Sequence, residues 1–208
     1  SRSDGTRHGC WPNGCGRVAG IVTEQQIVEV RGVGMTIGDV VSVARHRWPA
    51  VLTDVARREM AESAALIDAF VAADEPVYGV TTGFGSLAST PIPPERTAEL
   101  QVALVRSHAT GMGDPIEPEV VRATMLLRAR SLAMARSGAR PEIVDLQLAL
   151  LNAGITPVVY EHGSLGASGD LAPLSHCALA LIGEGEVWTV DGQIVPSADA
   201  LAGAGFTP

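Results

Sequence analysis

The stretch "GSLGASGDLAPLSH", residues 163–176, decides how this chain is interpreted. Glycine occupies its first, fourth and seventh positions, and Ser168 lies between Ala167 and Gly169. A carboxylate, Asp170, follows at once, and an apolar run begins behind it. So much backbone freedom around one serine is typical of three kinds of site. These are a phosphate-binding loop, a serine nucleophile, and a segment whose own backbone reacts.

Phosphate binding has little support. A P-loop ends in Lys followed by Ser or Thr, whereas here Asp170 follows Gly169, and its carboxylate would repel phosphate. A second glycine-rich run, "GFGSLA" at residues 83–88, loosely matches a dinucleotide-binding fingerprint. The prolines that follow it interrupt the helix that such a site requires. Neither run predicts a nucleotide site.

A serine hydrolase is the second alternative. Its nucleophile elbow reads G-x-S-x-G and connects a strand of a parallel sheet to a helix. Gly166 matches the first glycine, but Asp170 stands in place of the last, and the sequence shows no central parallel sheet. His176 would lie on the following helix. A histidine hydrogen-bonded to groups nearby in the sequence is the commoner interpretation of that position than a catalytic base.

The third alternative is a reaction of the backbone itself. Because Gly169 has no Cβ, its amide nitrogen can approach the carbonyl carbon of Ala167. Attack at that carbon with loss of one water would close a five-membered ring. Loss of a second water from Ser168 would turn its Cβ into an exocyclic methylene. The product would be an electrophile that needs no external cofactor.

Apolar spacing over the rest of the chain predicts mainly helices. Helices are expected at about residues 36–48, 52–74, 95–111, 117–138, 140–154, 170–183 and 197–205. Thr53 is expected to cap its helix, and Pro118 and Pro141 suit first helical turns. Short strands are expected at residues 25–32 and 155–161, and a hairpin at 185–196. The fold class is therefore mainly α, with short strands and hairpins.

Composition narrows the classes of protein. Hydrophobic residues make up 46% of the chain and charged residues 18%, so a sizeable core is expected. The net charge of −8 argues against a nucleic-acid-binding surface, which would be basic. No apolar run approaches the roughly 20 residues of a membrane span. Three cysteines, an odd number, speak against a disulfide framework, so an intracellular, cytoplasmic protein is expected.

The first residues differ from the remainder. Residues 1–21 show no apolar periodicity and no signal-peptide pattern, and are expected to be a disordered or non-native leader. His8, Cys10 and Cys15 lack a fourth ligand and the close cysteine pair typical of a zinc site, so no metal is expected. Residues 22–208 are expected to form the structured part.

Four motifs, in order, resemble the histidine and aromatic amino-acid ammonia-lyases. They are "PVYGVTTGFG" (76–85), "LVRSHATGMG" (104–113), "NAGITPVV" (152–159) and the stretch at 163–176. Together they indicate a resemblance over about residues 25–208. That family makes 4-methylidene-imidazol-5-one (MIO) from an Ala-Ser-Gly triplet. The resemblance implies that Ala167, Ser168 and Gly169 form MIO here, with no external cofactor.

The resemblance implies roles for further residues. Tyr78 matches the family's catalytic tyrosine, which would remove the β-proton of an amino-acid substrate. Gly83 and Gly85 would let the tyrosine loop fold close to the site. Asp170 would assist ring formation or hold the reactive loop through hydrogen bonds to backbone N–H groups. Hydrogen-bonding or positively charged neighbours are expected around Tyr78.

The pair Ser107-His108 predicts which substrate the protein binds. By resemblance it occupies the position where the family selects the substrate side chain, and its order resembles that of the histidine-specific members. L-Histidine is therefore the expected substrate. A tyrosine or phenylalanine ammonia-lyase or an aminomutase of the same family remains an alternative.

The resemblance also concerns what lies outside this sequence. Family members are more than twice as long, and a long helical bundle follows the part that resembles this chain. That bundle forms the core of a homotetramer, and the active sites are shared between subunits. The 208 residues are therefore expected to be the N-terminal, MIO-bearing part of such a lyase. A truncated, inactive fragment is the alternative.

Overall fold

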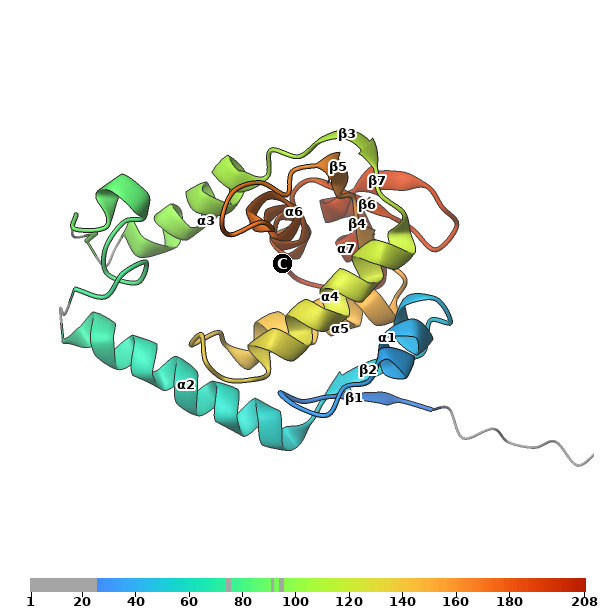
Figure 1. The fold of residues 1–208 in the computed structure, drawn as a ribbon, viewed down its shortest axis with the longest axis horizontal. Helices are drawn as coiled ribbons and strands as arrows, with labels where there is room; N and C mark the ends of the chain where they lie inside the picture. The colour runs from blue at the N-terminus through green and yellow to red at the C-terminus, as the bar shows by residue number, and fades with distance from the viewer. Residues whose placement is uncertain (1–25, 74–75, 91, 94–95) are drawn as a thin grey trace, which may run out of the picture.

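The structure is a computed structural model that describes residues 26–73, 76–90, 92–93 and 96–208. Its helices are α1 (Ile37–Ala44), α2 (Asp54–Ala72), α3 (Thr97–His108), α4 (Pro118–Leu132), α5 (Pro141–Asn152), α6 (Leu171–Leu181) and α7 (Ser197–Ala204), with a 3-10 turn at Gly85–Leu87. The central helices α4 and α5 pack together, and α1 packs on α4 (Figure 1). The prediction of a mainly helical fold is confirmed. The leader predicted for residues 1–21 lies outside the described residues.

The strands are short and form three small sheets. A parallel pair consists of β1 (Val28–Val30) and β2 (Ala50–Leu52). An antiparallel pair consists of β3 (Met112–Pro115) and β5 (Tyr160–His162). An antiparallel three-stranded sheet has the order β4 (Thr156–Pro157), β6 (Glu186–Trp188) and β7 (Ile194–Pro196). The predicted hairpin is the β6–β7 pair. The sequence analysis did not predict β2 or β3.

Local signals place the helix starts. Thr36 and Asp39 form a capping box before α1: the Thr36 side chain accepts from the Asp39 amide at 3.2 Å, and the Asp39 carboxylate accepts from the Thr36 amide at 2.8 Å. Thr53 caps α2, as predicted, by accepting from the Ala56 amide at 3.3 Å. Proline stands in the first turns of α4 and α5, also as predicted.

Two predicted boundaries were wrong. α4 ends at Leu132 instead of reaching residue 138, because the chain turns there and Ala135 takes a left-handed φ of 56°. The strand expected at 155–161 is divided into β4 and β5, which pair with different partners.

The core lies between α4, α5 and the strands around them. Its fully buried members include Met125, Leu126, Leu150 and Leu151, each 1% exposed or less. Burying side chains of this size stabilises a fold by about 1.5–3 kcal/mol each.

Asn152, at the end of α5, hydrogen-bonds to β2 in the way that a residue of a neighbouring strand would. Its side-chain amide both donates to and accepts from the backbone of Ala50, each at 2.9 Å.

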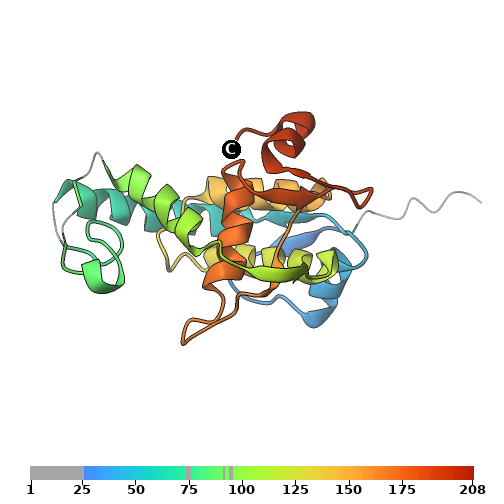
Figure 2. The ribbon, with the colours of Figure 1, turned by 90° about the horizontal axis from the view of Figure 1, so that it is seen from above.

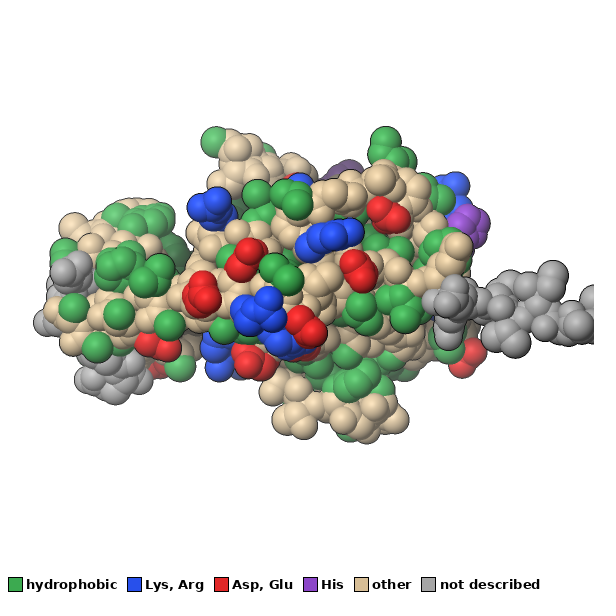
Figure 3. Space-filling view, turned by 90° about the horizontal axis from the view of Figure 1, so that it is seen from below, with side chains coloured by type: hydrophobic (Ala, Val, Ile, Leu, Met, Phe, Trp, Pro, Cys, Tyr) green, Lys and Arg blue, Asp and Glu red, His purple; other side chains and the backbone are tan. Residues whose placement is uncertain are grey.

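The loop of residues 163–170, which precedes α6 in the sequence and is called the Ser168 loop below, projects from the body of the molecule, as the view from above shows (Figure 2). The face seen from below carries acidic and basic side chains intermixed with exposed hydrophobic ones (Figure 3). Among the described residues, no helix is both long and apolar enough to cross a membrane.

Candidate active site

The Ala167-Ser168-Gly169 triplet lies in a tight turn. The Leu165 amide donates to the Gly169 carbonyl at 2.9 Å, which closes a loop over the three residues between them. Gly166 and Gly169 both have left-handed φ values, 75° and 73°. Residues with a Cβ rarely adopt such values, so both positions favour glycine.

A still tighter turn surrounds Gly169. The Asp170 amide donates to the Ser168 carbonyl at 2.9 Å, so this hydrogen bond spans one residue only. Ala167 and Ser168 are exposed, and a Cβ placed on Gly166 would meet no atom within 4 Å. The backbone of the triplet is compact and unobstructed. These residues fit the formation of MIO, which requires a close approach of backbone groups two residues apart.

Asp170 sits at the start of α6. Its carboxylate accepts a hydrogen bond from the Ser164 hydroxyl at 3.4 Å and makes no capping hydrogen bond to the helix. The partner therefore differs from the expected backbone N–H groups, because the Asp170 backbone, with φ −99° and ψ 23°, is not extended as at a typical N-cap. Asp170 joins the two ends of the loop through its side chain.

The tyrosine loop, residues 76–90, is built by its threonines. The Val77 amide donates to the Thr81 hydroxyl at 2.8 Å, and the Gly79 amide donates to the Thr82 hydroxyl at 3.3 Å. Thr82 itself is only 3% exposed. The side chains thereby satisfy amides in a turn that has no regular secondary structure.

Tyr78 lies on the outside of this loop, 63% exposed. The Gly85 amide donates to its hydroxyl oxygen at 3.3 Å, and Phe84 meets its ring edge-on with a centroid distance of 5.9 Å. The predicted hydrogen-bonding neighbour is therefore Gly85, and the neighbouring Gly83 is bound through its amide to the Thr90 carbonyl at 3.1 Å. Within the described ranges no positively charged group contacts Tyr78.

Ser107 and His108 form the last turn of α3. The Nδ1 atom of His108 lies 2.9 Å from the Leu104 carbonyl oxygen and 3.0 Å from the Ser107 hydroxyl. The carbonyl oxygen can only accept, so this geometry assigns the proton of a neutral imidazole to Nδ1. Nε2 is then an acceptor, and it has no partner in the described part of the chain.

Two contacts flank this pair. On one side, Arg106 forms an ion pair with Glu184, just after α6, with Nε 2.8 Å from Oε2. The hydrogen bond lowers the pKa of Glu184 and raises that of Arg106. On the other side, the Gly111 amide donates to Nε2 of His176 in α6 at 3.0 Å. The prediction of a locally bonded His176 was wrong, since its partner lies 65 residues away.

The structure does not bring all the candidate residues together. No hydrogen bond or ion pair joins Tyr78, His108 and Ser168 anywhere in the described ranges. The loop of residues 76–90 and the loop of residues 163–170 lie apart in both ribbon views (Figures 1 and 2). Within one chain, the candidate base and the candidate electrophile therefore belong to separate surfaces.

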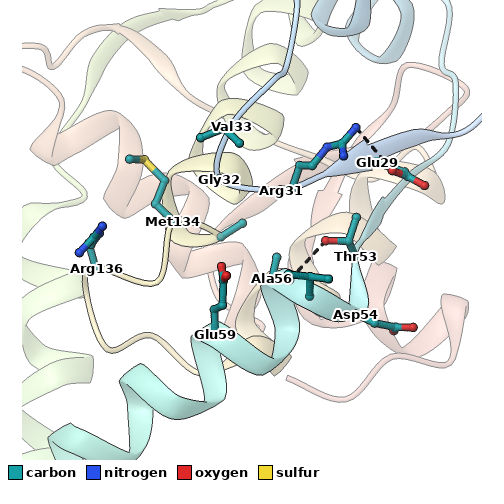
Figure 4. A pocket seen from close by; sticks show the side chains of 12 residues that line it. Glu29, Arg31, Gly32, Val33, Thr53, Asp54, Ala56, Glu59, Met134 and Arg136 are labelled. Atoms are coloured by element: carbon teal, nitrogen blue, oxygen red, sulfur yellow. Dashed lines mark hydrogen bonds and ion pairs between the residues drawn. The ribbon is translucent and has the colours of Figure 1, made fainter.

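A cavity of about 570 Å³ lies elsewhere, between the end of β1, the start of α2 and the segment after α4 (Figure 4). Its charged lining consists of Glu29, Arg31, Asp54, Glu59 and Arg136. None of the predicted site residues lines it. The cavity, although large, is therefore separate from the Ser168 loop and its chemistry.

Two further observations concern reactive side chains. Cys177, in α6, is 7% exposed, and burial raises the pKa of its thiol to about 12, so it packs as an apolar residue. No group of three or more potential metal ligands occurs among the described residues. The predicted leader residues His8, Cys10 and Cys15 lie outside them.

The helical scaffold and the glycine-rich turn agree with the family that the sequence matches. The sequence pattern of the family described as "Aromatic amino acid lyase" matches residues 35–208. The chain belongs to this family.

Within the family, the chain is similar to histidine ammonia-lyases. It is 53% identical to that of Streptomyces griseus over 175 residues, which are 84% of this chain and 34% of the enzyme. The crystal structure of histidine ammonia-lyase from Trypanosoma cruzi matches 88% of the chain and 35% of its own, with a TM-score of 0.79 and 33% identity. The tyrosine aminomutase from Streptomyces globisporus matches 88% of the chain and 34% of its own, with a TM-score of 0.81 and 36% identity.

The chain thus spans about a third of the length of the curated relatives it matches. Scaffold similarity does not separate a histidine lyase from a tyrosine aminomutase, because both structures superpose about equally well.

Proposed function

We propose that this chain is the N-terminal, MIO-bearing part of a histidine ammonia-lyase. The enzyme would eliminate ammonia from L-histidine to give trans-urocanate, the first step of histidine degradation. The observation that carries the proposal is the Ala167-Ser168-Gly169 turn, compact and exposed at the start of α6. Identity of about half to histidine ammonia-lyases over the matched part supports the choice of substrate.

The chemical task has two difficulties. The amine of an amino acid is a poor leaving group, and its β-proton is weakly acidic. MIO, formed from Ala167, Ser168 and Gly169, supplies an electrophile toward the substrate amine. Tyr78 takes the β-proton, and the Gly85 N–H, which donates to its hydroxyl oxygen at 3.3 Å, holds that oxygen in place. Asp170 holds the loop through Ser164.

Replacing Tyr78 by phenylalanine is expected to lower kcat by a factor of about 10²–10⁴, the usual contribution of a positioned base. The fold should persist, because the Tyr78 side chain is largely exposed and loses only the Gly85 contact. Turnover of L-histidine by the full-length protein and circular dichroism measure the two effects. Tyr160→Phe is the matched control, since Tyr160 is the only other tyrosine of the chain. Equal kcat values for the two variants would remove Tyr78 from the mechanism.

Substrate selection is assigned to Ser107 and His108. With its proton on Nδ1, His108 presents Nε2 as an acceptor, which matches the N–H of an imidazole substrate. A phenyl ring has no such donor and would leave this acceptor unpaired. The pair therefore favours histidine over phenylalanine.

Replacing His108 by leucine is expected to lower kcat/KM for L-histidine by about 10–100-fold, the effect of one lost hydrogen bond to substrate. Ring formation at Ser168 should be unaffected. The exposed His46 offers the same substitution away from the site, and His46→Leu should leave kcat/KM unchanged. An unchanged preference for histidine over phenylalanine in His108→Leu would contradict the assignment.

The separation of the two loops has a consequence for assembly. Because Tyr78 and Ser168 lie apart within one chain, we infer that each active site combines loops of different subunits. A cytoplasmic homotetramer would provide such sites, together with residues outside the matched third of the relatives. The molecular mass of the full-length protein in solution tests this arrangement.

A tyrosine aminomutase is the second candidate, since the Streptomyces globisporus structure resembles the chain as closely as the histidine lyase does. It would share the MIO chemistry. Incubation with L-tyrosine and L-histidine separately decides between them: urocanate from histidine supports the lyase, whereas a β-amino acid from tyrosine supports the mutase. If the full-length protein turned over neither amino acid, it would be a catalytically inactive protein.

A further inference from the structure

His176 occupies a junction between the two functional segments of this chain. It is a partly buried residue of α6, which begins directly after the Ser168 loop. Its Nε2 accepts the Gly111 amide at 3.0 Å, and Gly111 follows His108 by three residues. The edge of the imidazole meets the Tyr160 ring with a centroid distance of 5.2 Å and an interplanar angle of 69°.

The junction is tightly packed. A Cβ on Gly111 would lie 3.0 Å from Nε2 of His176. A Cβ on Gly163, the first residue of the reactive stretch, would lie 3.3 Å from Cα of Gly111 and 3.2 Å from Cβ of Ala172. All three distances are shorter than ordinary van der Waals contact. The segment after α3, the start of the Ser168 loop and the first turns of α6 therefore share one contact region.

We propose that His176 is a positioning residue for the lyase reaction, holding the end of α3, and with it His108, in register with the Ser168 loop. This inference rests on the proposed function, because it gives His108 and Ser168 their roles in one reaction. Two anchors then flank Ser107-His108: the Arg106–Glu184 ion pair and the Gly111–His176 hydrogen bond. The ion pair is exposed and therefore weak, so the partly buried hydrogen bond is the stronger constraint on the end of α3.

The role requires a neutral imidazole, since only neutral His176 can accept at Nε2 while Nδ1 carries the proton. Burial lowers the pKa of His176, which favours this form. The neighbouring phenol, Tyr160, donates to the Glu186 carboxylate at 3.4 Å, and both burial and that carboxylate raise its pKa, so it stays uncharged. The titratable groups at the end of α3 are His108 and Arg106, and Arg106 is paired with Glu184. In the part of the chain that the structure describes, no hydrogen bond or ion pair joins a charged side chain to the His176 imidazole.

The sign of the pH effect follows. The folded-state pKa lies below the ordinary value of about 6.5, so the contact is intact above that value. It is lost as the pH falls through the lowered pKa, because protonated Nε2 becomes a donor facing the Gly111 N–H.

The experiment compares the wild type with two variants. His176→Gln keeps an acceptor but does not titrate, and His176→Phe keeps an aromatic ring but has no acceptor. Hydrogen exchange at the Gly111 amide, corrected for the intrinsic rate, is measured from pH 7.5 downward for as long as the protein stays folded. The wild type should lose about tenfold protection as the pH falls through the lowered pKa of His176, as expected for one hydrogen bond. His176→Gln should stay protected throughout, and His176→Phe should be unprotected at both ends.

Kinetics supply the readout that a purely structural role would not give. In the full-length protein, KM for L-histidine should rise relative to His176→Gln as the pH falls, with kcat changing less. Titration of the substrate affects both proteins equally, so it cancels in the ratio of the wild-type KM to the KM of His176→Gln. His176→Phe should show a raised KM at every pH, while core amides such as that of Leu148 stay slow in all three proteins.

The outcomes separate the two proposals. Equal Gly111 exchange in the three proteins, or a KM ratio that does not depend on pH, would overturn the role of His176 while histidine turnover persists. A wild type that protects Gly111 but does not turn over histidine would instead overturn the proposed function, and the positioning role with it.

Discussion

Replacing Ser168 by alanine is expected to abolish the reactive group and leave the fold unchanged. Cleavage after Glu161 and Glu184 releases residues 162–184, which contain the triplet. In the wild type this peptide should be lighter than its sequence by two water molecules. In Ser168→Ala it should have its full mass, and kcat for L-histidine should fall by about three orders of magnitude or more, as when a covalent catalyst is removed.

The structural reason is the position of the side chain. Ser168 is exposed, and its hydroxyl makes no hydrogen bond with any described residue; only its backbone carbonyl is engaged, by the Asp170 amide. Alanine at this exposed position should change the free energy of unfolding by less than about 0.5 kcal/mol. A large activity loss without a stability loss would therefore report on chemistry alone.

Ser175→Ala is the matched control, because the same substitution falls in the same peptide but on α6. It should still show the loss of two waters and keep its activity. If the wild-type peptide had its full mass in a folded protein, Ser168 would not form MIO and the proposed function would fail at its central step.

Replacing Arg122 by methionine is expected to lower the free energy of unfolding by about 3 kcal/mol or more. Arg122 is 2% exposed and lies in the middle of the fold. Burial lowers the pKa of its guanidinium to about 10, which still leaves it charged at neutral pH. Urea unfolding measures the change.

The partners of Arg122 explain the size of this effect. Its guanidinium donates to the carbonyls of Val43 and Ala44 at the end of α1, at 2.8 and 3.1 Å, and to Leu151 at the end of α5, at 2.8 Å. Carbonyls at helix C-termini have no partner within the helix and carry partial negative charge. One side chain from α4 thereby neutralises two helix ends that meet in the core.

Two variants test this account. Arg122→Lys should be intermediate, because a single ammonium lacks the planar fork that spans carbonyls of two helices. Arg128→Met, on the exposed side of the same helix, should change the free energy of unfolding by less than about 0.5 kcal/mol. Equal losses in Arg122→Met and Arg128→Met would show that the buried guanidinium contributes nothing specific.

Much of the fold follows from signals within a few residues of sequence. The Thr53 cap, the first-turn prolines of α4 and α5, and the β6–β7 hairpin are each determined by neighbouring residues, and the predictions were correct there. The end of α4 was predicted too late, because alanine and arginine continue to favour a helix beyond Leu132 while the packed chain turns. β2 and β3 were missed because each is stabilised mainly by a partner far along the chain.

By itself, the sequence determined the family resemblance, the mainly helical class and the chemistry that the Ala167-Ser168-Gly169 triplet can undergo. These depend on residue types at short spacing, where backbone freedom and side-chain chemistry act directly. Only the tertiary structure decided that His176 binds Gly111, that Arg122 joins two helix ends, and that Tyr78 lies apart from Ser168. Such contacts join segments tens of residues apart, and their geometry depends on how the helices pack, which no local pattern encodes.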